Sequence, residues 1–506
     1  MKLGALLSDT AARRPAHIAC VCGPHERTFA GLDQKATHVA NALRSLDVKP
    51  GDRVALYLPN CMAAIELMCG CARAGAVVVP IPSRLTIAEA DYIISDSEPR
   101  VLFTADANVH VTGGHLVKFV LDVEREADAL ADFLAQPDDT PFPPLPQQPD
   151  DIVLGYTSGT TGNPKGAVGT HSTIILNSGM ITATEYGLHA DDRMLVTSPI
   201  AHRVGLSRIV NMICTGLTTV VMQRFDAAAA IDLIERYQIT GISVVPTIAR
   251  LLAPEFAKDA ERCRSLEYLY ATGEAFPVPL KTEIAATLPW LKLHTSYAQT
   301  EAGFVCNLRP HEQTLKPESV GRAVPGVEVR IVDEQCRDVA LGEAGEILVR
   351  GGTPGSGTTM REYFRRPDET REAFVDGWLR TGDMGRADAD GYFYFVDRLK
   401  DMVVSGGLNI YAKEVELAIV SHTGVADAAV VGVPDHEYGE AVLAFVVCER
   451  GATLSAADII AHCRALLASY KKPRHVIFVE RMPRTASGKV RKPELRALYA
   501  QELEQL

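Results

Sequence analysis

The sequence predicts an α/β fold, with a large N-terminal domain of parallel or mixed sheets covered by helices, a small β-barrel-like unit and a small α+β C-terminal domain. Three observations predict it. Apolar strands alternate with helices over most of the chain, short strands with turns follow from about residue 320, and a mixed pattern resumes after Asp397. The length of 506 residues suits about three compact units.

The first repeating unit is a helix, a turn and a buried strand. Apolar side chains recur on one helical face between residues 32 and 46, and the apolar run 54–58 follows the turn at Pro50 and Gly51. The same alternation predicts a parallel or mixed sheet with helices on both faces. Further strand-like runs lie at residues 101–103, 195–198, 218–222, 242–245, 268–272 and 291–296.

The segment 137–149 contains six prolines, a composition that excludes a helix or a central strand. We interpret it as a surface linker that joins two sub-lobes near residues 137–150. The N-terminal domain then covers residues 1–397, with the small β unit at about 320–397, and the C-terminal domain covers 398–506.

The β unit and the C-terminal domain show short elements separated by turns. About 105 residues beyond Asp397 suffice for an independent domain. The expected strands are 327–333, 345–351, 428–433, 442–447 and 476–480, and the expected helices are 411–421 and 456–468.

Composition excludes several classes of protein. The chain has 51 Lys and Arg against 63 Asp and Glu, a net charge of −12, which argues against a nucleic-acid binder. The most apolar stretch, residues 61–82, is interrupted by charges and by Gly75 and Pro80, so it predicts a helix and a strand rather than a membrane span. Eleven scattered cysteines and an N-terminus unlike a signal peptide predict a cytoplasmic protein.

The strongest motif is Tyr156-Thr-Ser-Gly-Thr-Thr-Gly-Asn-Pro-Lys165-Gly166, which follows an apolar strand. Its glycines let backbone N–H groups converge on an anion, its hydroxyls can donate to phosphate oxygens, and Lys165 adds charge. The spacing of a Walker A loop is absent, which disfavours a P-loop kinase or GTPase. The motif therefore predicts a phosphate-binding loop of a different kind.

This loop resembles the signature of the adenylate-forming superfamily, which includes acyl-CoA synthetases, peptide-synthetase adenylation domains and beetle luciferases. Further motifs of that family follow in the expected order, so the resemblance covers nearly the whole chain. They are Ala201-His202, Gly273-Glu274-Ala275, Tyr297-Ala-Gln-Thr300-Glu301, Trp378-Leu-Arg-Thr-Gly-Asp383, Asp397-Arg398-Leu-Lys400-Asp401, Ser405-Gly406-Gly407 and Pro483-Arg-Thr-Ala-Ser-Gly-Lys489.

The resemblance implies that residues from these motifs together form an ATP site. The residues implied are Thr157, Ser158, Gly159, Thr160, Thr161, Gly162, Lys165, Gly273, Glu274, Ala275, Tyr297, Thr300, Asp383, Arg398 and Lys489. Glu301 would bind Mg²⁺, for which a carboxylate is a suitable hard ligand, and Thr300 the α-phosphate. Asp383 and Arg398 would hydrogen-bond the ribose.

Catalysis would involve His202, Thr300, Glu301 and Lys489, because in the family the histidine lies beside the carboxylate substrate and the lysine between that carboxylate and the α-phosphate. Gly406 and Gly407 would line the path of coenzyme A, and Lys400 would be the hinge of a mobile C-terminal domain. Lys489 lies within a basic run, residues 471–492, whose net charge of +7 indicates an anion site.

The acid substrate is the main open question. Arg203 and Arg208 follow His202 where apolar or small residues are more usual. They could pair with a second carboxylate or a polar tail of the substrate, but the sequence favours the alternative that one or both face solvent or a CoA phosphate. Ala298, where a glycine is usual, could narrow the pocket, and Met360-Arg-Glu362-Tyr replaces a common Gly-Tyr.

The predicted function is ATP-dependent ligation of a small-molecule carboxylate to CoA, through acyl-AMP and pyrophosphate. The substrates are ATP, CoA and the acid, the cofactor is Mg²⁺, and neither nucleic acid nor an integral membrane segment is expected. A homodimer is left open. The alternatives are transfer of the acyl group to a carrier protein and a non-catalytic adenylate-binding protein, which the presence of both Glu301 and Lys489 disfavours.

Overall fold

Two compact units make up the chain in the computed structural model, which describes residues 1–106, 109, 116–123, 129–157, 163–273, 276–406, 408–484 and 490–503. The first unit contains Met1–Val329, Leu348–Thr381 and Gly391–Phe393. The second contains Arg330–Ile347, Gly382–Asp390 and Tyr394–Leu506.

A six-stranded sheet of the first unit has the order β6-β5-β3-β4-β7-β8 and is parallel except for the antiparallel pair β7 and β8. The predicted helix and strand within 61–82, and those at 32–46 and 54–58, are confirmed. The strands are β3 (Arg53–Leu58), β4 (Val77–Pro82), β5 (Val101–Thr104), β6 (Val117–Val120), β7 (Asp151–Thr157) and β8 (Lys165–Thr170), and the helices before β7 are α1 (Leu3–Arg13), α2 (Phe29–Ser45), α3 (Met62–Ala74) and α4 (Ile87–Ser97).

Helix α2 shows how the sequence sets these elements. The side chain of Thr28 caps its first turn by accepting a hydrogen bond from the backbone N–H of Gly31 at 3.1 Å. Its apolar stripe is buried and packs against α3, where a Cβ at Gly70 would lie only 2.1 Å from Cγ1 of Val39. A glycine at this position therefore allows the two helices to approach closely.

A nine-stranded sheet of the first unit has the order β15-β14-β13-β12-β11-β9-β10-β1-β2. Its centre is parallel and its edges are antiparallel, so the predicted mixed sheet is confirmed. The strands are β1 (Ile18–Cys22), β2 (His25–Thr28), β9 (Arg193–Val196), β10 (Thr218–Val221), β11 (Gly241–Val244), β12 (Tyr268–Thr272), β13 (Lys292–Gln299), β14 (Gly303–Leu308) and β15 (Arg322–Ala323).

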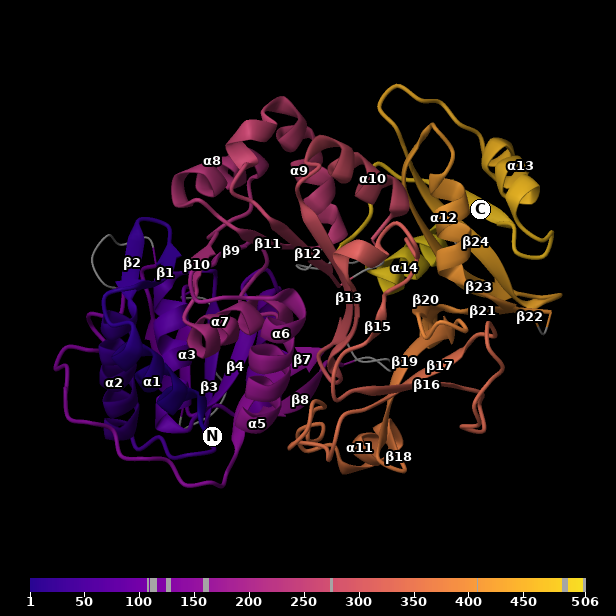
Figure 1. Cartoon of the computed structure of the whole chain (residues 1–506). Coiled ribbons are helices and arrows are strands. Elements are labelled where there is room, and N and C mark those ends of the chain that lie inside the picture. The colour runs from indigo at the N-terminus through magenta and orange to yellow at the C-terminus, as the bar shows by residue number, and fades with distance from the viewer. Residues whose placement is uncertain are drawn as a thin grey trace. The chain divides into compact units, whose positions relative to one another are not determined.

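Helices cover both faces of this sheet, with α8 and α9 on one face and α7 on the other (Figure 1). A buried cluster of Leu, Ile, Val and Phe side chains joins α8, α9 and α10 to the sheet. The helical segments of this part of the chain are α5 (His171–Thr173), the π-helical η1 (Ile174–Ile181), α6 (Thr182–Tyr186), α7 (Arg203–Thr215), α8 (Ala227–Tyr237), α9 (Pro246–Lys258), η2 (Ala260–Cys263), α10 (Val278–Thr287) and η3 (Pro310–Glu312).

The proline-rich segment 137–149 is a loop, as expected from its composition. It leads into β7, whereas the strand before it is β6, and both strands belong to the six-stranded sheet. It is therefore a connection between two strands of one sheet.

The small β unit is a five-stranded sheet of order β16-β17-β19-β18, with β20 paired to β19. Its strands run through the boundary between the two compact units and contribute residues to each. Its elements are β16 (Glu328–Val332), β17 (Gly345–Arg350), α11 (Pro367–Ala373), β18 (Phe374–Val375), β19 (Trp378–Ala387) and β20 (Phe393–Arg398).

The rest of the second unit is a five-stranded sheet of order β22-β21-β24-β23, with β25 paired to β24, packed against helices. The predicted α+β content of this region is confirmed. Its elements are η4 (Leu399–Asp401), β21 (Val403–Ser405), β22 (Leu408–Ile410), α12 (Ala412–Val420), β23 (Val425–Asp435), β24 (Gly439–Cys448), α13 (Ala456–Leu466), β25 (His475–Phe478) and α14 (Lys492–Leu503).

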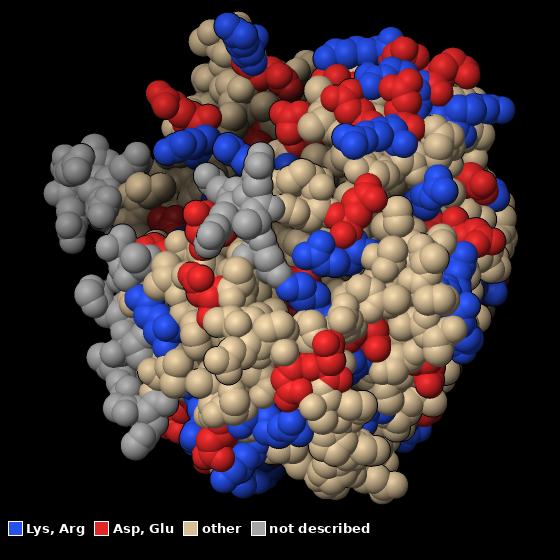
Figure 2. All heavy atoms as spheres, turned by 90° about the vertical axis from the view of Figure 1, so that its left-hand side faces the viewer, with Lys and Arg blue, Asp and Glu red and all other residues tan. Residues whose placement is uncertain are grey.

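The distribution of charged side chains on the surface and the state of the cysteines agree with the sequence composition. Figure 2 shows Lys and Arg interspersed with Asp and Glu over the described part of one face. All eleven cysteines lie within the described residues and are free thiols, most of them buried. Within the described ranges, helices long and apolar enough to span a bilayer are absent.

Candidate active site

The phosphate-binding motif begins and ends on paired strands. Strand β7 ends at Thr157 and β8 begins at Lys165, and these two residues are partners in the antiparallel ladder. The predicted strand before the loop is thus confirmed. Five predicted site residues, Ser158, Gly159, Thr160, Thr161 and Gly162, lie outside the described residues.

The carboxylate of Glu301 lies opposite the start of this loop. Glu301 is in the turn between β13 and β14, and its Oε1 accepts a hydrogen bond from Oγ1 of Thr157 at 2.9 Å. The hydroxyl of Tyr363 donates to the same oxygen at 3.1 Å. The structure therefore brings together two predicted site residues that are 144 positions apart.

This carboxylate suits a magnesium ion that also binds a nucleotide. Clusters of three or more His, Cys, Asp or Glu side chains that could enclose a metal are absent from the described part of the chain. Mg²⁺ is usually held by one or two carboxylates together with substrate phosphates and water, so a single carboxylate beside a phosphate-binding loop is an adequate protein contribution.

Helix α7 begins directly after His202, whose backbone has extended dihedral angles at the N-cap position. The position of this helix is fixed by Gly205, where a Cβ would lie 2.4 Å from the carbonyl oxygen of Pro199. A side chain at residue 205 would displace the segment that carries His202.

Arg203 connects α7 to the Thr300–Glu301 turn. Its guanidinium donates to the carbonyl oxygen of Thr300 at 3.1 Å and to Oδ1 of Asn177 at 3.3 Å. Burial lowers the pKa of Arg203 to about 10, while the nearby charge of Glu301 acts in the opposite direction. Arg203 thus has hydrogen-bond partners within the protein, next to the predicted catalytic residues Thr300 and Glu301.

Gly273 and Tyr297, two of the residues that the resemblance assigns to the ATP site, lie at the ends of adjacent parallel strands. Thr272 of β12 pairs with Ser296 of β13, and Gly273 and Tyr297 follow that pair. Gly273 has a φ of +95°, which favours glycine, and Tyr297 is buried. Glu274 and Ala275 lie outside the described residues.

The predicted ribose-binding residues lie in the second unit and face each other. Nε of Arg398 is 3.7 Å from Oδ1 of Asp383, and Asp383 is buried. Lys400 follows in the short helix η4 and its side chain is exposed. The sequence order therefore identified two residues that are adjacent in space.

The predicted residues of the CoA path and of adenylation are partly described. Gly406 has a φ of +58°, and its backbone N–H donates to the carbonyl oxygen of Tyr438 at 2.8 Å. Gly407 and Lys489 lie outside the described residues. Residues 484 and 490, on either side of the segment that contains Lys489, form an isolated β-bridge.

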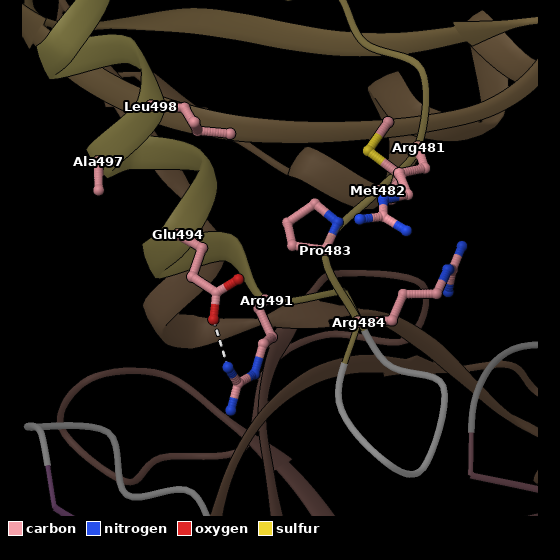
Figure 3. A pocket seen from close by; sticks show the side chains of 8 residues that line it. All are labelled: Arg481, Met482, Pro483, Arg484, Arg491, Glu494, Ala497 and Leu498. Carbon is pink, nitrogen blue, oxygen red and sulfur yellow. Dashed lines mark hydrogen bonds and ion pairs between the residues drawn. The ribbon is translucent and has the colours of Figure 1, made fainter. Parts of the chain in front are cut away.

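The basic run 471–492 is largely neutralised by acidic partners within the second unit. The pairs are Lys471 with Glu414, Arg474 with Asp435, Arg484 with Asp427, Arg491 with Glu494 and Lys492 with Glu416. A pocket of about 630 Å³ beside this run is lined by three of its arginines together with apolar side chains from α14 and the preceding loop (Figure 3). Five of the eight basic side chains of this run thus have an acidic partner.

Arg208 is buried, with 4% of the residue exposed, so it does not face solvent. The expectation that one or both of Arg203 and Arg208 face solvent or a CoA phosphate therefore does not hold for solvent at Arg208. The guanidinium lies 5.3 Å from the centre of the Tyr186 ring. The sequence could not show this, because Tyr186 lies on α6, a separate segment of the chain.

Two residues of this site, Asn177 and Tyr363, are absent from the sequence-based predictions. Asn177 accepts from the backbone N–H of Phe304 at 2.8 Å as well as from Arg203, and nothing in its sequence context distinguishes it. Tyr363 binds Glu301, and its ring lies 5.3 Å from Nζ of Lys165. The unusual Met360-Arg-Glu362-Tyr sequence was the available signal for Tyr363.

Comparison with known proteins agrees with this geometry. A sequence model described as AMP-binding enzyme matches residues 7–364, and one described as AMP-binding enzyme C-terminal domain matches residues 414–489. A feruloyl-CoA synthase of an Amycolatopsis species is 36% identical over 480 residues, which cover 93% of this chain and 94% of the relative.

A long-chain-fatty-acid–CoA ligase, FadD13 of Mycobacterium tuberculosis, is 35% identical over 484 residues, covering 94% of this chain and 93% of the relative. The solved o-succinylbenzoate CoA synthetase MenE from Bacillus subtilis, in complex with ATP and a magnesium ion, superimposes with a TM-score of 0.85 at 29% identity, covering 97% of this chain and 99% of that chain. The chain therefore belongs to the AMP-binding enzyme family, in the acyl-CoA synthetase branch of the adenylate-forming superfamily, and is an ATP-dependent carboxylate–CoA ligase.

Proposed function

We propose that the residues gathered around Glu301 form the adenylation site of this ligase. The supporting observation is the pair of hydroxyl hydrogen bonds, from Thr157 and Tyr363, that orient the Glu301 carboxylate beside the phosphate-binding motif. In this proposal Glu301 holds Mg²⁺, Thr300 contacts the α-phosphate, and the loop from Thr157 to Lys165 binds the triphosphate. Bound magnesium would neutralise charge on the phosphate oxygens.

The reaction has two steps. A carboxylate oxygen of the acid attacks the α-phosphorus of ATP, the bond to the β-phosphate oxygen breaks, and pyrophosphate leaves. The thiolate of CoA then attacks the acyl carbonyl carbon and AMP leaves. His202 and Lys489 are proposed to position and neutralise the attacking carboxylate, because two anions approach each other in the first step.

The second unit supplies the remaining proposed contacts. Asp383 and Arg398 would bind the ribose hydroxyls, Gly406 and Gly407 would line the CoA path, and Lys400 would be the hinge on which residues 398–506 turn between the two steps. The proposed setting is the cytoplasm, because eleven unpaired thiols suit a reducing compartment.

The proposed acid substrate is a small-molecule carboxylate. The two relatives above are named for different acyl groups, feruloyl and long-chain fatty acyl, so they do not define a narrower class. A panel of aryl, short-chain and long-chain acids, with acyl-CoA products identified by mass spectrometry, gives the substrate range. Parallel assays with an acyl-carrier protein replacing CoA test the alternative acceptor.

The substitution Glu301→Gln tests the site. The neutral amide retains the volume but is a weaker ligand for a hard cation, so acyl-AMP formation should fall and excess Mg²⁺ should partly restore it. Glu255→Gln is the matched control, since Glu255 pairs with Lys258 on the surface of α9. A wild-type rate and Mg²⁺ dependence in Glu301→Gln would exclude Glu301 as the ligand.

A further inference from the structure

A buried arginine without a counter-charge lies close to the proposed acid site. Arg208 is 4% exposed, and its Nε and Nη1 atoms have no hydrogen-bond partner. No carboxylate of the described chain forms an ion pair with it. Burying a charge without a partner is costly, and natural structures seldom leave such donors unsatisfied.

The groups around Arg208 are neutral aromatic rings. Tyr186 stacks on Tyr270 with ring centres 4.2 Å apart, and its hydroxyl is 2.6 Å from Oγ of Ser296. Burial raises the pKa of both tyrosines, so neither can supply a negative charge near neutral pH. The Tyr186 ring forms a cation–π contact with the guanidinium, but neither neutral ring compensates its charge.

The nearest acidic residue on the same helix as Tyr186 is already paired. Glu185 accepts hydrogen bonds from Arg309 at 2.9 Å and from Nδ2 of Asn307 at 3.0 Å. The free energy gained by those contacts would be lost if Glu185 turned toward Arg208. Among the described residues, no carboxylate therefore forms an ion pair with the Arg208 guanidinium.

Three segments connect Arg208 to the acid site. Helix α7 starts next to His202, six residues before Arg208, which is about 9 Å along a helix axis. Tyr270 belongs to β12, which ends just before Gly273, and Ser296 belongs to β13, which ends just before Thr300. An acid whose reacting carboxylate lies between His202 and Thr300 could direct its other end toward Arg208.

We propose that Arg208 is a specificity residue that pairs with a second carboxylate at the far end of the acid substrate, so that the preferred substrates are dicarboxylic acids with a spacer of a short chain or one ring. This inference rests on the proposed function of the His202 and Thr300 region. The second carboxylate would accept hydrogen bonds from the unsatisfied donors and compensate the buried charge. A purely apolar acyl chain would leave both uncompensated.

Matched acid pairs test this proposal in the full-length enzyme. The pairs are glutarate and pentanoate, adipate and hexanoate, suberate and octanoate, and 3-carboxyphenylacetate and 3-methylphenylacetate. In at least one pair the wild-type kcat/KM for the dicarboxylate should exceed that for the monoacid by about tenfold or more. Arg208→Met, which removes the charge but retains an unbranched chain, should reverse that preference, with little loss for the monoacid.

Two further variants keep the test decisive. Arg208→Lys retains a charge and should keep a reduced preference for the dicarboxylate, which also gives a readout if Arg208→Met does not fold. Arg262→Met removes a partly exposed arginine that pairs with Asp232 and Glu235, and should leave the preference unchanged.

The outcomes separate this proposal from the proposed function. Efficient turnover of monoacids without a preference for dicarboxylates in any pair would overturn the role of Arg208 but leave the ligase function intact. Equal losses for both members of a pair in Arg208→Met and Arg208→Lys would likewise overturn it and indicate a structural role. If pyrophosphate is released with none of these acids and with none of a broad panel of control acids, the result would instead contradict the proposed adenylation site.

Discussion

The hydroxyl of Tyr363 donates a hydrogen bond to Oε1 of Glu301 at 3.1 Å. This bond links the segment between β17 and α11 to the turn between β13 and β14. The backbone reinforces this link, because the N–H of Met360 donates to the carbonyl oxygen of Glu301 at 2.7 Å. Orientation of the carboxylate thus depends on a residue 62 positions away in the sequence.

Replacing Tyr363 by phenylalanine should weaken metal binding without removing the carboxylate. One hydrogen bond to a charged group contributes about 1.5 to 3 kcal/mol when lost in full, and Thr157 retains part of the orientation. We expect the Mg²⁺ concentration for half-maximal pyrophosphate release to rise about three- to tenfold. Tyr268→Phe is the control, since the hydroxyl that it removes accepts a hydrogen bond from Nζ of Lys292 at 3.2 Å. An equal rise in both variants would contradict the prediction.

Gly205 positions the start of α7, and an alanine there should disturb it. The added Cβ would lie 2.4 Å from the Pro199 carbonyl oxygen and 2.6 Å from Cα of Ile200, both backbone atoms that cannot move independently. Overpacking of this kind costs about 1 to 3 kcal/mol. We expect a lower unfolding temperature together with slower acyl-AMP formation.

The control for that prediction is Gly31→Ala in α2. A Cβ at Gly31 has its nearest neighbour, Oγ1 of Thr28, at 3.4 Å, so alanine should be neutral or slightly stabilising. Thermal unfolding and single-turnover adenylation should be measured on both variants. Unchanged stability and rate in Gly205→Ala would show that the helix start can move without consequence.

Much of this fold and part of the site could be predicted from the sequence. Periodicity located α2, α3 and the central strands of both large sheets, because burial on one face imposes a regular spacing, whereas β1, β2, β6, β14 and β15 were not predicted. Motif order indicated that Asp383 and Arg398 belong to one site, and they face each other.

The remaining features depend on contacts between distant segments. Sequence spacing does not give strand order, so the pairing of Thr157 with Glu301 could not be derived from periodicity. The composition of residues 471–492 indicates an anion site but does not show the acidic partners outside the run, such as Glu414 and Asp427. The composition of the proline-rich segment likewise predicts a loop but not which strands the loop joins.

Stability should fall at acidic pH because a buried histidine must remain neutral. The backbone N–H of Leu3 donates to Nδ1 of His171 at 3.1 Å, and burial lowers the pKa of His171 to about 4. The pKa in the unfolded chain is about 6.5, so the unfolded state binds more protons between these values. The stability contribution is present above pH 6.5 and is lost as the pH falls toward 4, by up to about 3 kcal/mol.

The variant His171→Gln keeps a hydrogen-bond acceptor but cannot titrate. Between pH 7 and pH 5 it should lose about 2 kcal/mol less unfolding free energy than the wild type. Urea unfolding at both pH values measures this difference, with His311→Gln as the control because the His311 side chain is 74% exposed. Equal pH dependence of the wild type and His171→Gln would show that other groups dominate acid unfolding.

Lys489 provides the sharpest test of the proposed two-step mechanism. If its ammonium group lies between the attacking carboxylate and the α-phosphate, it stabilises charge chiefly in the transition state of adenylation. Lys489→Ala should then reduce acyl-AMP formation about 100-fold or more. Conversion of supplied acyl-AMP and CoA should stay near the wild-type rate, because a rotation about Lys400 would move Lys489 away before the second step.

Single-turnover kinetics of both half-reactions on the same preparation measure these two effects separately. Lys472→Ala is the matched control, since Lys472 lies in the same basic run but donates to the carbonyl oxygen of Ser469 at 3.1 Å. That variant should retain both half-reactions. Equal losses in the two half-reactions of Lys489→Ala would reject the alternation between two poses, and an unchanged adenylation rate would reject Lys489 as a catalytic residue.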